Sequence, residues 1–266
     1  MLDTTGAGEQ IWRLETGSGP LIATAIHDGH QVREEVSSYL ALGDSERLRE
    51  EDPYTGEWTR VAPTQIVGKR SRFEVDLNRS REKAVYRIPE DAWGLTVWSG
   101  NPPAAMFERS LSEYDAFYDA MHQLFTEISQ KYGRFVVYDL HSYNHRRNGA
   151  DGPLADDEGN PQVNIGTGTM NRQLWAPIVD TFIDKLREFD FPGGRLDVRE
   201  NVKFFGGAWP RWIHETFPDT GLAIAIEFKK FFMDEWTGAA DENHVRSIGE
   251  ALRFTVPAVL GALKRA

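Results

Sequence analysis

The sequence predicts an α/β layered fold, because short β-branched strands alternate along the chain with longer segments of helical period. Two of these runs, Val136–Tyr138 and Leu222–Ile226, are apolar on both faces, which is typical of strands buried in a parallel sheet. The 266 residues show no internal repeat and no shift of composition. We therefore expect one domain over residues 1–266, preceded by an N-terminal extension at residues 1–19.

Eight strands are expected from the apolar runs. They are Leu21–Ile26, Thr64–Val67, Phe73–Leu77, Thr96–Trp98, Phe135–Leu140, Val163–Ile165, Val202–Phe205 and Leu222–Phe228. The polar segment from Tyr143 to Gly168 is too long for an ordinary connection in a compact domain. We expect residues 143–168 to form an active-site loop.

Three helices are expected from apolar residues at helical spacing. The first begins at a capping box formed by Ser110 and Glu113 and stops near Gly133. The other two are Trp175–Phe189 and Asn243–Leu263.

Composition excludes several classes of protein. The chain has 41 acidic and 30 basic residues and a net charge of −11, which argues against binding to a nucleic-acid backbone. It has no cysteine, which excludes a disulfide scaffold, a cysteine nucleophile and a thiolate zinc site. It contains no apolar run of about 18 residues and no apparent secretion signal, so we expect no membrane span and a cytoplasmic protein.

Two histidines follow predicted buried strands. His27 comes directly after Leu21–Ile26, and His141 directly after Phe135–Leu140. Ligands of open α/β sheets lie at the carboxyl ends of strands, where two imidazoles could share a zinc ion. Asp139, on the same strand face as His141, is a candidate partner for that imidazole. The alternative is a pair of strand ends with partly exposed histidines.

A catalytic zinc usually takes a third protein ligand and keeps one position open for water. Glu50, Glu51 and Asp52 offer three carboxylates in a row before a turn. The alternative is a solvated acidic helix end.

Arg72 lies directly before the predicted strand Phe73–Leu77, and Asn78 and Arg79 lie directly after it. Guanidinium groups bind carboxylates bidentately, so these arginines are candidates to hold an acidic substrate, with Asn78 as a further donor. Ordinary ion pairs on a surface strand are the alternative.

Glu227 stands at the end of an apolar strand, where burial is costly unless the carboxylate is paired or functional. Burial would raise its pKa toward the range of a general base beside a metal ion. A salt bridge to Lys229 or Lys230 is the structural alternative.

Taken in order, these segments resemble the N-formylglutamate amidohydrolase family, a distant relative of the zinc carboxypeptidases and of aspartoacylase-type deacylases. The segments that carry the resemblance are Ile26–Gly29, Ser71–Phe73, Asp76–Arg79, Asp139–Ser142, Asn164–Thr167, Phe205–Gly207, Ile226–Glu227 and Met233–Glu235. The resemblance implies a three-layer α/β fold like that of the zinc carboxypeptidases. Its central sheet would be mixed but mostly parallel, with helices on both faces.

The resemblance also implies a metal site with one Zn²⁺ per chain, or another divalent transition metal. His27, Asp52 and His141 would be its ligands, with His30 or Glu51 as alternative third ligands.

The remaining roles follow from the same resemblance. Glu227 would be the general base, and Arg72 would polarise the scissile carbonyl or help to bind the carboxylate of the substrate. Asn78 and Arg79 would bind the carboxylate of the substrate. Arg146 is a further candidate for substrate binding because it lies in the basic part of the expected active-site loop, which is a departure from the family pattern.

The expected function is hydrolysis of a linear amide bond in a small acidic N-acyl amino acid such as N-formylglutamate. Two alternatives stay open: a metallocarboxypeptidase that acts on a peptide C-terminus, and a non-catalytic homologue that binds a metal or ligand. The sequence makes no prediction of oligomeric state.

Overall fold

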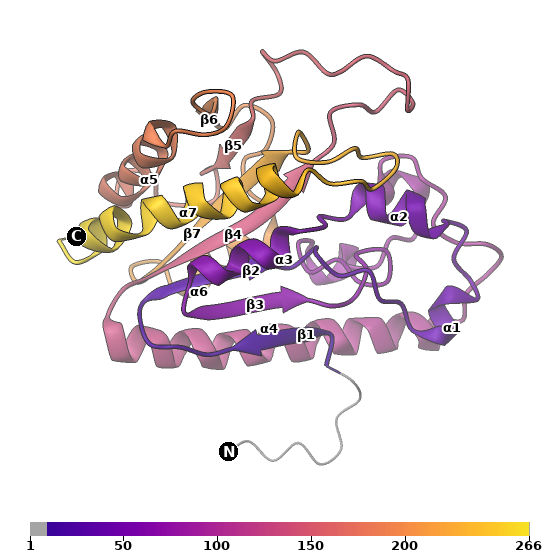
Figure 1. Ribbon diagram of the computed structural model, residues 1–266. Coiled ribbons are helices and arrows are strands. Elements are labelled where there is room, and N and C mark those ends of the chain that lie inside the picture. Colours follow the sequence, from indigo (N-terminus) through magenta and orange to yellow (C-terminus); the bar gives the residue numbers. More distant parts are fainter. Residues whose placement is uncertain (1–9, 266) are drawn as a thin grey trace.

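The computed structural model describes residues 10–265, which form three layers with a seven-stranded sheet in the middle (Figure 1). The strands are β1 (Trp12–Glu15), β2 (Leu21–Ala25), β3 (Thr64–Gly68), β4 (Phe135–Tyr143), β5 (Val163–Gly166), β6 (Val198–Glu200) and β7 (Gly221–Lys229). Their order across the sheet is β1-β3-β2-β4-β7-β5-β6. The predicted fold class, a mixed and mostly parallel sheet between helices, is confirmed.

Three neighbouring strands at the centre of the sheet run parallel. Strand β4 pairs with β2 on one side and with β7 on the other, and β3 extends the parallel part beyond β2. Among the strand pairs of this sheet within residues 10–265, only β1 with β3 and β5 with β7 are antiparallel. All residues of β2 and β4 are buried. The carboxyl ends of β2, β4 and β7 therefore meet at one edge of the sheet.

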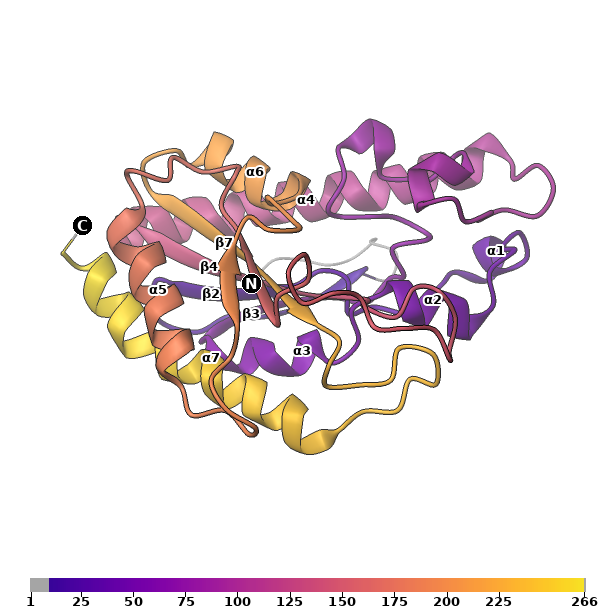
Figure 2. The same ribbon diagram turned by 90° about the horizontal axis from the view of Figure 1, so that it is seen from above.

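Helices cover both faces of the sheet (Figure 2). The helices are α1 (Glu34–Ser37), α2 (Asp44–Glu50), α3 (Thr55–Trp58), α4 (Ala104–Tyr132), α5 (Ala176–Glu188), α6 (Ala208–Thr216) and α7 (Glu242–Leu263). Short 3-10 turns lie at Thr59–Val61, Arg81–Lys83 and Pro89–Ala92. None of the helices within residues 10–265 is long and apolar enough to cross a membrane.

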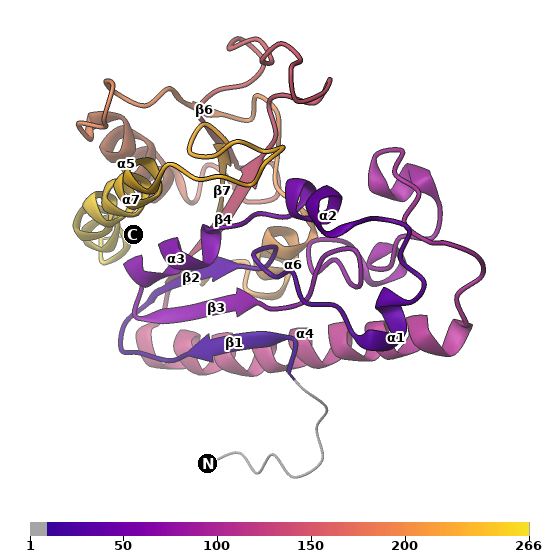
Figure 3. The same cartoon turned by 45° about the vertical axis from the view of Figure 1, so that its right-hand side comes forward.

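Successive side chains along a strand point to opposite faces of the sheet, so each strand contributes to the core on both faces. Val136 and Tyr138 pack with α3, α5 and α7, and Figure 3 shows α5 and α7 side by side. Phe135 and Val137 point the other way and pack with α4 and α6. Asp139 and His141 continue this second series, so they share its side of the sheet.

Three predicted strands are wrong. Phe73–Leu77 is folded into turns, because the amides of Glu74 and Val75 donate to the carbonyl of Ser71. Thr96–Trp98 contributes only an isolated bridge from Trp98 to Leu40.

The third wrong strand is Val202–Phe205, and the edge strand lies earlier, at β6. A side chain takes the place of the main-chain hydrogen bonds that a neighbouring strand would form here. Asn164 Oδ1 accepts from the amides of Val202 (3.0 Å) and Lys203 (2.8 Å). Strand β1 was not predicted; it lies within the expected extension at 1–19, of which residues 1–9 fall outside the described residues.

The first long helix begins six residues earlier than expected. Helix α4 starts at Ala104 after Pro103, so the predicted capping box at Ser110 and Glu113 lies inside the helix. Ser110 is buried, and its Oγ accepts a hydrogen bond from Arg33 Nη2 at 2.9 Å. The spacing of apolar residues predicts this helix correctly, but it does not fix the residue at which the helix begins.

Candidate active site

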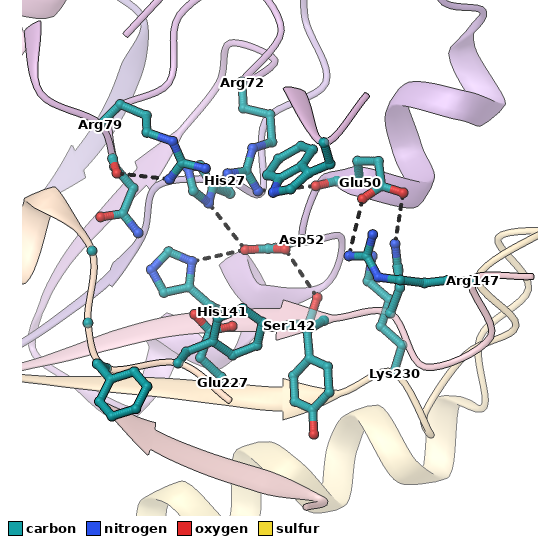
Figure 4. Close-up of a pocket in the computed structure, with 18 residues that line it drawn as sticks. His27, Glu50, Asp52, Arg72, Arg79, His141, Ser142, Arg147, Glu227 and Lys230 are labelled. Carbon is teal, nitrogen blue, oxygen red and sulfur yellow. Dashed lines mark hydrogen bonds and ion pairs between the residues drawn. The ribbon is translucent and has the colours of Figure 1, made fainter. Parts of the chain in front are cut away.

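The carboxyl edge of the central strands carries a cavity of about 340 Å³ (Figure 4). His27 follows β2, His141 lies near the end of β4, and Glu227 lies near the end of β7. His141 and Glu227 are register partners across the β4–β7 ladder, so their side chains leave the sheet on the same side. The parallel sheet thus brings these three predicted site residues together.

Asp52 joins the two histidines and completes the predicted metal-ligating set. Its Oδ2 lies 2.9 Å from His141 Nδ1 and 3.4 Å from His27 Nδ1. One donor atom from each of the three residues lies within 4.8 Å of the others, and all three residues are buried. The amide of Asp52 also donates to the carbonyl of His27 at 2.9 Å, which fixes the turn after α2 against the end of β2. We call His27, Asp52 and His141 the His–Asp–His group.

The outer nitrogen of each imidazole faces a second carboxylate. His27 Nε2 donates to Asp76 Oδ1 at 2.7 Å, and His141 Nε2 lies 3.1 Å from Asp139 Oδ2. Asp139 is itself held by Thr24, whose Oγ1 donates to it at 2.8 Å. Carboxylates in this position orient imidazole rings and direct the opposite nitrogen toward a metal ion. Asp139 has the supporting position that the sequence suggested.

The charges of this group depend on one another. Burial opposes ionisation of Asp52, but hydrogen bonds from His141 and His27 outweigh it and lower the pKa of the carboxyl well below its ordinary value. Burial likewise opposes protonation of His141, but the neighbouring Asp139 carboxylate raises the pKa of this imidazole well above its ordinary value. The carboxylates of Asp52 and Asp139 thus favour a positive charge at this position, which a proton on His141 or a bound cation can supply.

The donor set fits a zinc ion. Two imidazole nitrogens and one carboxylate oxygen, with the far side of each ring held by an acid, are what a catalytic zinc site requires. All three residues line the cavity, so an ion that they held would supply Lewis-acid chemistry to a molecule bound there.

Glu227 lines the cavity beside His141. Burial raises the pKa of its carboxyl to about 7, although the neighbouring His141 opposes the shift. A carboxyl group with this pKa exchanges protons near neutral pH, as a general base must. The alternative, an ion pair of Glu227 with Lys229 or Lys230, is not found: Lys229 Nζ donates to Asp157, and Lys230 Nζ donates to main-chain carbonyls.

Arg72, Asn78 and Arg79 line the cavity together with Glu50 and Arg147. Figure 4 shows Arg79 on the side away from Arg147 and Arg72 beside Glu50, to whose carbonyl Arg72 Nη1 donates at 3.2 Å. Arg72 Nη2 donates to Asp76 Oδ2 at 2.8 Å, so its charge is already balanced. Arg79 Nη1 donates to the carbonyl of Asn78 at 3.3 Å, and within residues 10–265 it forms no ion pair with a carboxylate. Arg79 is therefore the more available anion-binding group of the two.

Asn78 is fixed by the start of helix α6. Its Oδ1 accepts from the amide of Trp209 at 2.9 Å, which leaves its Nδ2 as a donor for the cavity. A Cβ at Gly207 would lie 2.1 Å from Asn78 Oδ1, so glycine is required for this close approach.

The alternative third ligands lie elsewhere. His30 Nδ1 is 2.5 Å from Glu51 Oε2, and Ser71 Oγ also donates to Glu51. Neither His30 nor Glu51 belongs to the group that could hold a metal ion or lines the cavity. In the structure, Asp52 is the carboxylate that meets the two histidines.

The predicted role of Arg146 in substrate binding is not supported. Arg146 does not line the cavity, and its Nη1 donates to Asp234 Oδ2 at 3.2 Å and to the carbonyl of Ala150 at 2.9 Å. The loop instead directs Arg147 to the cavity, where it lies 3.6 Å from Glu50 Oε2. Sequence alone does not tell which of two adjacent loop arginines faces the site.

Two contributions were missed by the sequence reasoning. Asp76 has no predicted role, yet it contacts His27, Arg72 and the amide of Asn78 (2.8 Å) together. Lys230 is 1% exposed, and its Nζ donates to the carbonyls of Arg49 (2.6 Å) and Glu51 (2.8 Å). The sequence feature that could have indicated a role for Asp76 is its position in a polar cluster, two residues before Asn78. For Lys230 the only such feature is its closeness to Glu227 in the sequence.

The fold and the site define an α/β protein with a buried His–Asp–His group at the carboxyl edge of its sheet. The profile of the N-formylglutamate amidohydrolase family matches residues 19–233, and the chain belongs to this family. It is an amidohydrolase, a hydrolase of amide bonds.

Solved structures with the same fold have low sequence identity. The N-formylglutamate amidohydrolase from Ralstonia eutropha JMP134 is 17% identical, with a TM-score of 0.74 over 97% of this chain and 99% of that chain. The gene product Atu2144 from Agrobacterium tumefaciens is 18% identical, with a TM-score of 0.68 over 96% and 97%. No curated protein sequence matches the chain.

Proposed function

We propose that this protein is a zinc-dependent amidohydrolase that cleaves the linear amide bond of an N-acyl amino acid, the substrate class to which N-formylglutamate belongs. The observation that carries the proposal is the cavity that the His–Asp–His group shares with Glu227, Asn78 and Arg79. It combines a metal-ligating set, a carboxyl group with a pKa of about 7 and a carboxylate-binding arginine. We also retain the predicted cytoplasmic location, which cell fractionation tests.

Each residue of the cavity has a separate role in the proposed hydrolysis. A zinc ion held by the His–Asp–His group would supply Lewis-acid chemistry toward water and the scissile carbonyl. Glu227 accepts a proton from the attacking water and passes it to the nitrogen of the leaving amine. The water oxygen bonds to the acyl carbon, the C–N bond breaks, and a carboxylate and an amine are released. Arg72, on the cavity wall, stabilises the charge that develops on the carbonyl oxygen.

Arg79 and Asn78 hold the carboxylate of the substrate. The guanidinium supplies a charged donor and Asn78 Nδ2 a neutral one, both on the wall of the cavity. A carboxylate bound there fixes the amide relative to Glu227, and such positioning is a large part of catalysis.

The test compares the zinc-loaded wild-type protein with Glu227→Gln on N-formyl amino acids. Loss of the base should lower turnover about 10²–10⁴-fold while zinc content stays the same. Glu127→Gln, which removes the same charge from the exposed face of α4, should keep full activity. A fully active Glu227→Gln variant contradicts the assignment of the base.

The same assay separates the proposal from its alternatives. Hydrolysis of short peptides at their free C-terminus, without hydrolysis of N-formyl amino acids, identifies a metallocarboxypeptidase. Bound zinc without hydrolysis of either group of compounds identifies a non-catalytic homologue.

A further inference from the structure

The charged residues of the cavity provide one free site for a carboxylate. Arg72 is paired with Asp76, and Arg147 lies 3.6 Å from the Glu50 carboxylate. Lys230, the remaining cation of the lining, is 1% exposed and directs its Nζ at two main-chain carbonyls. Arg79 is left without a carboxylate partner in the described part of the chain.

Glu50 occupies the place where a second substrate carboxylate would meet Arg147. Its side chain is 8% exposed and lines the cavity, and its Oε1 accepts from Asn144 Nδ2 at 3.1 Å and lies 3.4 Å from Arg49 Nε. Arg49 does not line the cavity. A dicarboxylate such as N-formylglutamate would bring its second negative charge toward Glu50 and would have to displace it from Arg147.

The lining of the cavity includes two exposed aromatic side chains. Seven large apolar side chains are exposed among the described residues, and two of them, Trp93 (45% exposed) and Phe205 (58%), line this cavity. Single exposed apolar residues are ordinary, but an exposed aromatic side chain in the lining of a pocket is available to contact an apolar group of a bound molecule. Trp93 also has a φ of +55°, a conformation that bulky residues rarely adopt.

Trp93 borders the carboxylate site directly. The centre of its ring lies 5.7 Å from the Arg79 guanidinium and 4.7 Å from that of Arg72. A carboxylate on Arg79 therefore places the substituent of the adjacent carbon beside an aromatic ring. In an N-acyl amino acid, that substituent is the amino-acid side chain.

We infer that the substrates of this protein are N-acyl amino acids with a single carboxylate and an apolar or aromatic side chain. Trp93 and Phe205 bind this side chain. Glu50 repels a second carboxylate and so selects against dicarboxylate substrates. This inference rests on the proposed function and narrows its substrate class. It predicts that the protein prefers N-formyl derivatives of apolar amino acids to N-formylglutamate.

The first test measures kcat/KM of the zinc-loaded wild-type protein for three N-formyl-L-amino acids. The phenylalanine derivative should exceed the glutamine derivative by about tenfold through apolar contact. The glutamine derivative should exceed the glutamate derivative, its charged counterpart, by about tenfold through repulsion. A wild-type preference for the glutamate derivative overturns the inference. Equal activity on N-hexanoylglycine and the phenylalanine derivative would assign the contact with Trp93 and Phe205 to the acyl chain and overturn the side-chain assignment.

Variants assign each preference to its residue. Glu50→Gln should reduce the glutamine-to-glutamate ratio about tenfold, because Arg147 becomes available. Phe205→Ala and Trp93→Ala should each reduce the phenylalanine-to-glutamine ratio. Ratios measured within one variant do not depend on the fraction of folded protein. Glu127→Gln and Phe254→Ala, exposed controls on α4 and α7, should leave both ratios unchanged. Unchanged ratios in Glu50→Gln and in both aromatic variants contradict the inference.

Binding separates failure of this inference from failure of the proposed function. If the wild-type protein hydrolyses no N-formyl amino acid, the proposed reaction is wrong. Calorimetric titration of the three compounds into zinc-loaded Glu227→Gln still reports the selectivity of the cavity. The order phenylalanine, glutamine, glutamate supports the inference, and the reverse order overturns it.

Discussion

The imidazole rings of His27 and His141 lie edge to face, with their centres 5.0 Å apart, and both direct Nδ1 toward the same oxygen of Asp52. This relationship follows from the parallel pairing of β2 with β4, which brings the two strand ends to one edge. Asp52 reaches the same point because its amide is hydrogen-bonded to the carbonyl of His27. The outer nitrogens are held by Asp76 and Asp139.

Asp139→Asn should weaken zinc binding about 10–100-fold, because the ring of His141 loses the charged partner of its Nε2. Competition with a chromogenic chelator measures the affinity. Asp119→Asn, on the exposed face of α4, is the matched control and should bind zinc like the wild type. Equal affinities in all three proteins would show that Asp139 does not support the metal site.

Gly207→Ala should raise KM about tenfold with a smaller effect on kcat, because the new Cβ would displace Asn78 from the carboxylate site. Gly249→Ala is the control: its Cβ would have an ordinary contact of 3.8 Å with Trp58, and alanine favours the helix. Steady-state kinetics on an N-formyl amino acid measures KM and kcat of both variants. An unchanged KM in Gly207→Ala would remove Asn78 from the substrate site.

Lys230→Met should lower the free energy of unfolding by about 2 kcal/mol, because the buried carbonyls of Arg49 and Glu51 lose their donor. These carbonyls belong to the turn that carries Asp52, so zinc affinity should fall as well. Chemical denaturation and zinc titration measure the two effects. Lys264→Met, at an exposed position, should change neither, and a Lys230→Met protein that matches it would contradict this role.

Protonation of His214 should destabilise the fold at low pH. Its Nε2 accepts from the amide of Ala223 at 3.0 Å, and Nδ1 lies 3.0 Å from Thr169 Oγ1, so the neutral ring is the one that fits. Burial lowers the pKa of this imidazole to about 4. The unfolded chain then binds more protons than the folded one between pH 6.5 and 4. The stability from this group is complete above pH 6.5 and is lost on acidification, on the order of 3 kcal/mol.

The measurement is the free energy of unfolding at several pH values from 7 to 4. The stability of His214→Gln should fall less steeply over this range than that of the wild type, and His122→Gln, an exposed control, should follow the wild type. Parallel curves for His214→Gln and the wild type would rule out this titration.

Site residues at the ends of strands could be predicted from the sequence. His27, His141 and Glu227 follow or end apolar strands, and a parallel sheet necessarily brings such ends together. Strand Val202–Phe205 was wrong because the side chain of Asn164 satisfies its amides, an interaction between segments far apart in sequence.

The rest of the site depends on irregular chain, which has no periodicity to read. Asp76 contacts three other site residues only because residues 71–80 fold into turns. The choice between Arg146 and Arg147 is decided by contacts with Asp234 and Glu50, from two other segments. Such contacts arise from tertiary packing and leave no local pattern.

The most direct test of the central claim is zinc-dependent hydrolysis. Protein stripped with a chelator should lose hydrolysis of N-formyl amino acids and recover it when one equivalent of Zn²⁺ per chain is added, whereas Asp52→Asn should not recover. Full activity of the stripped protein, with no zinc detectable by mass spectrometry, would contradict the account.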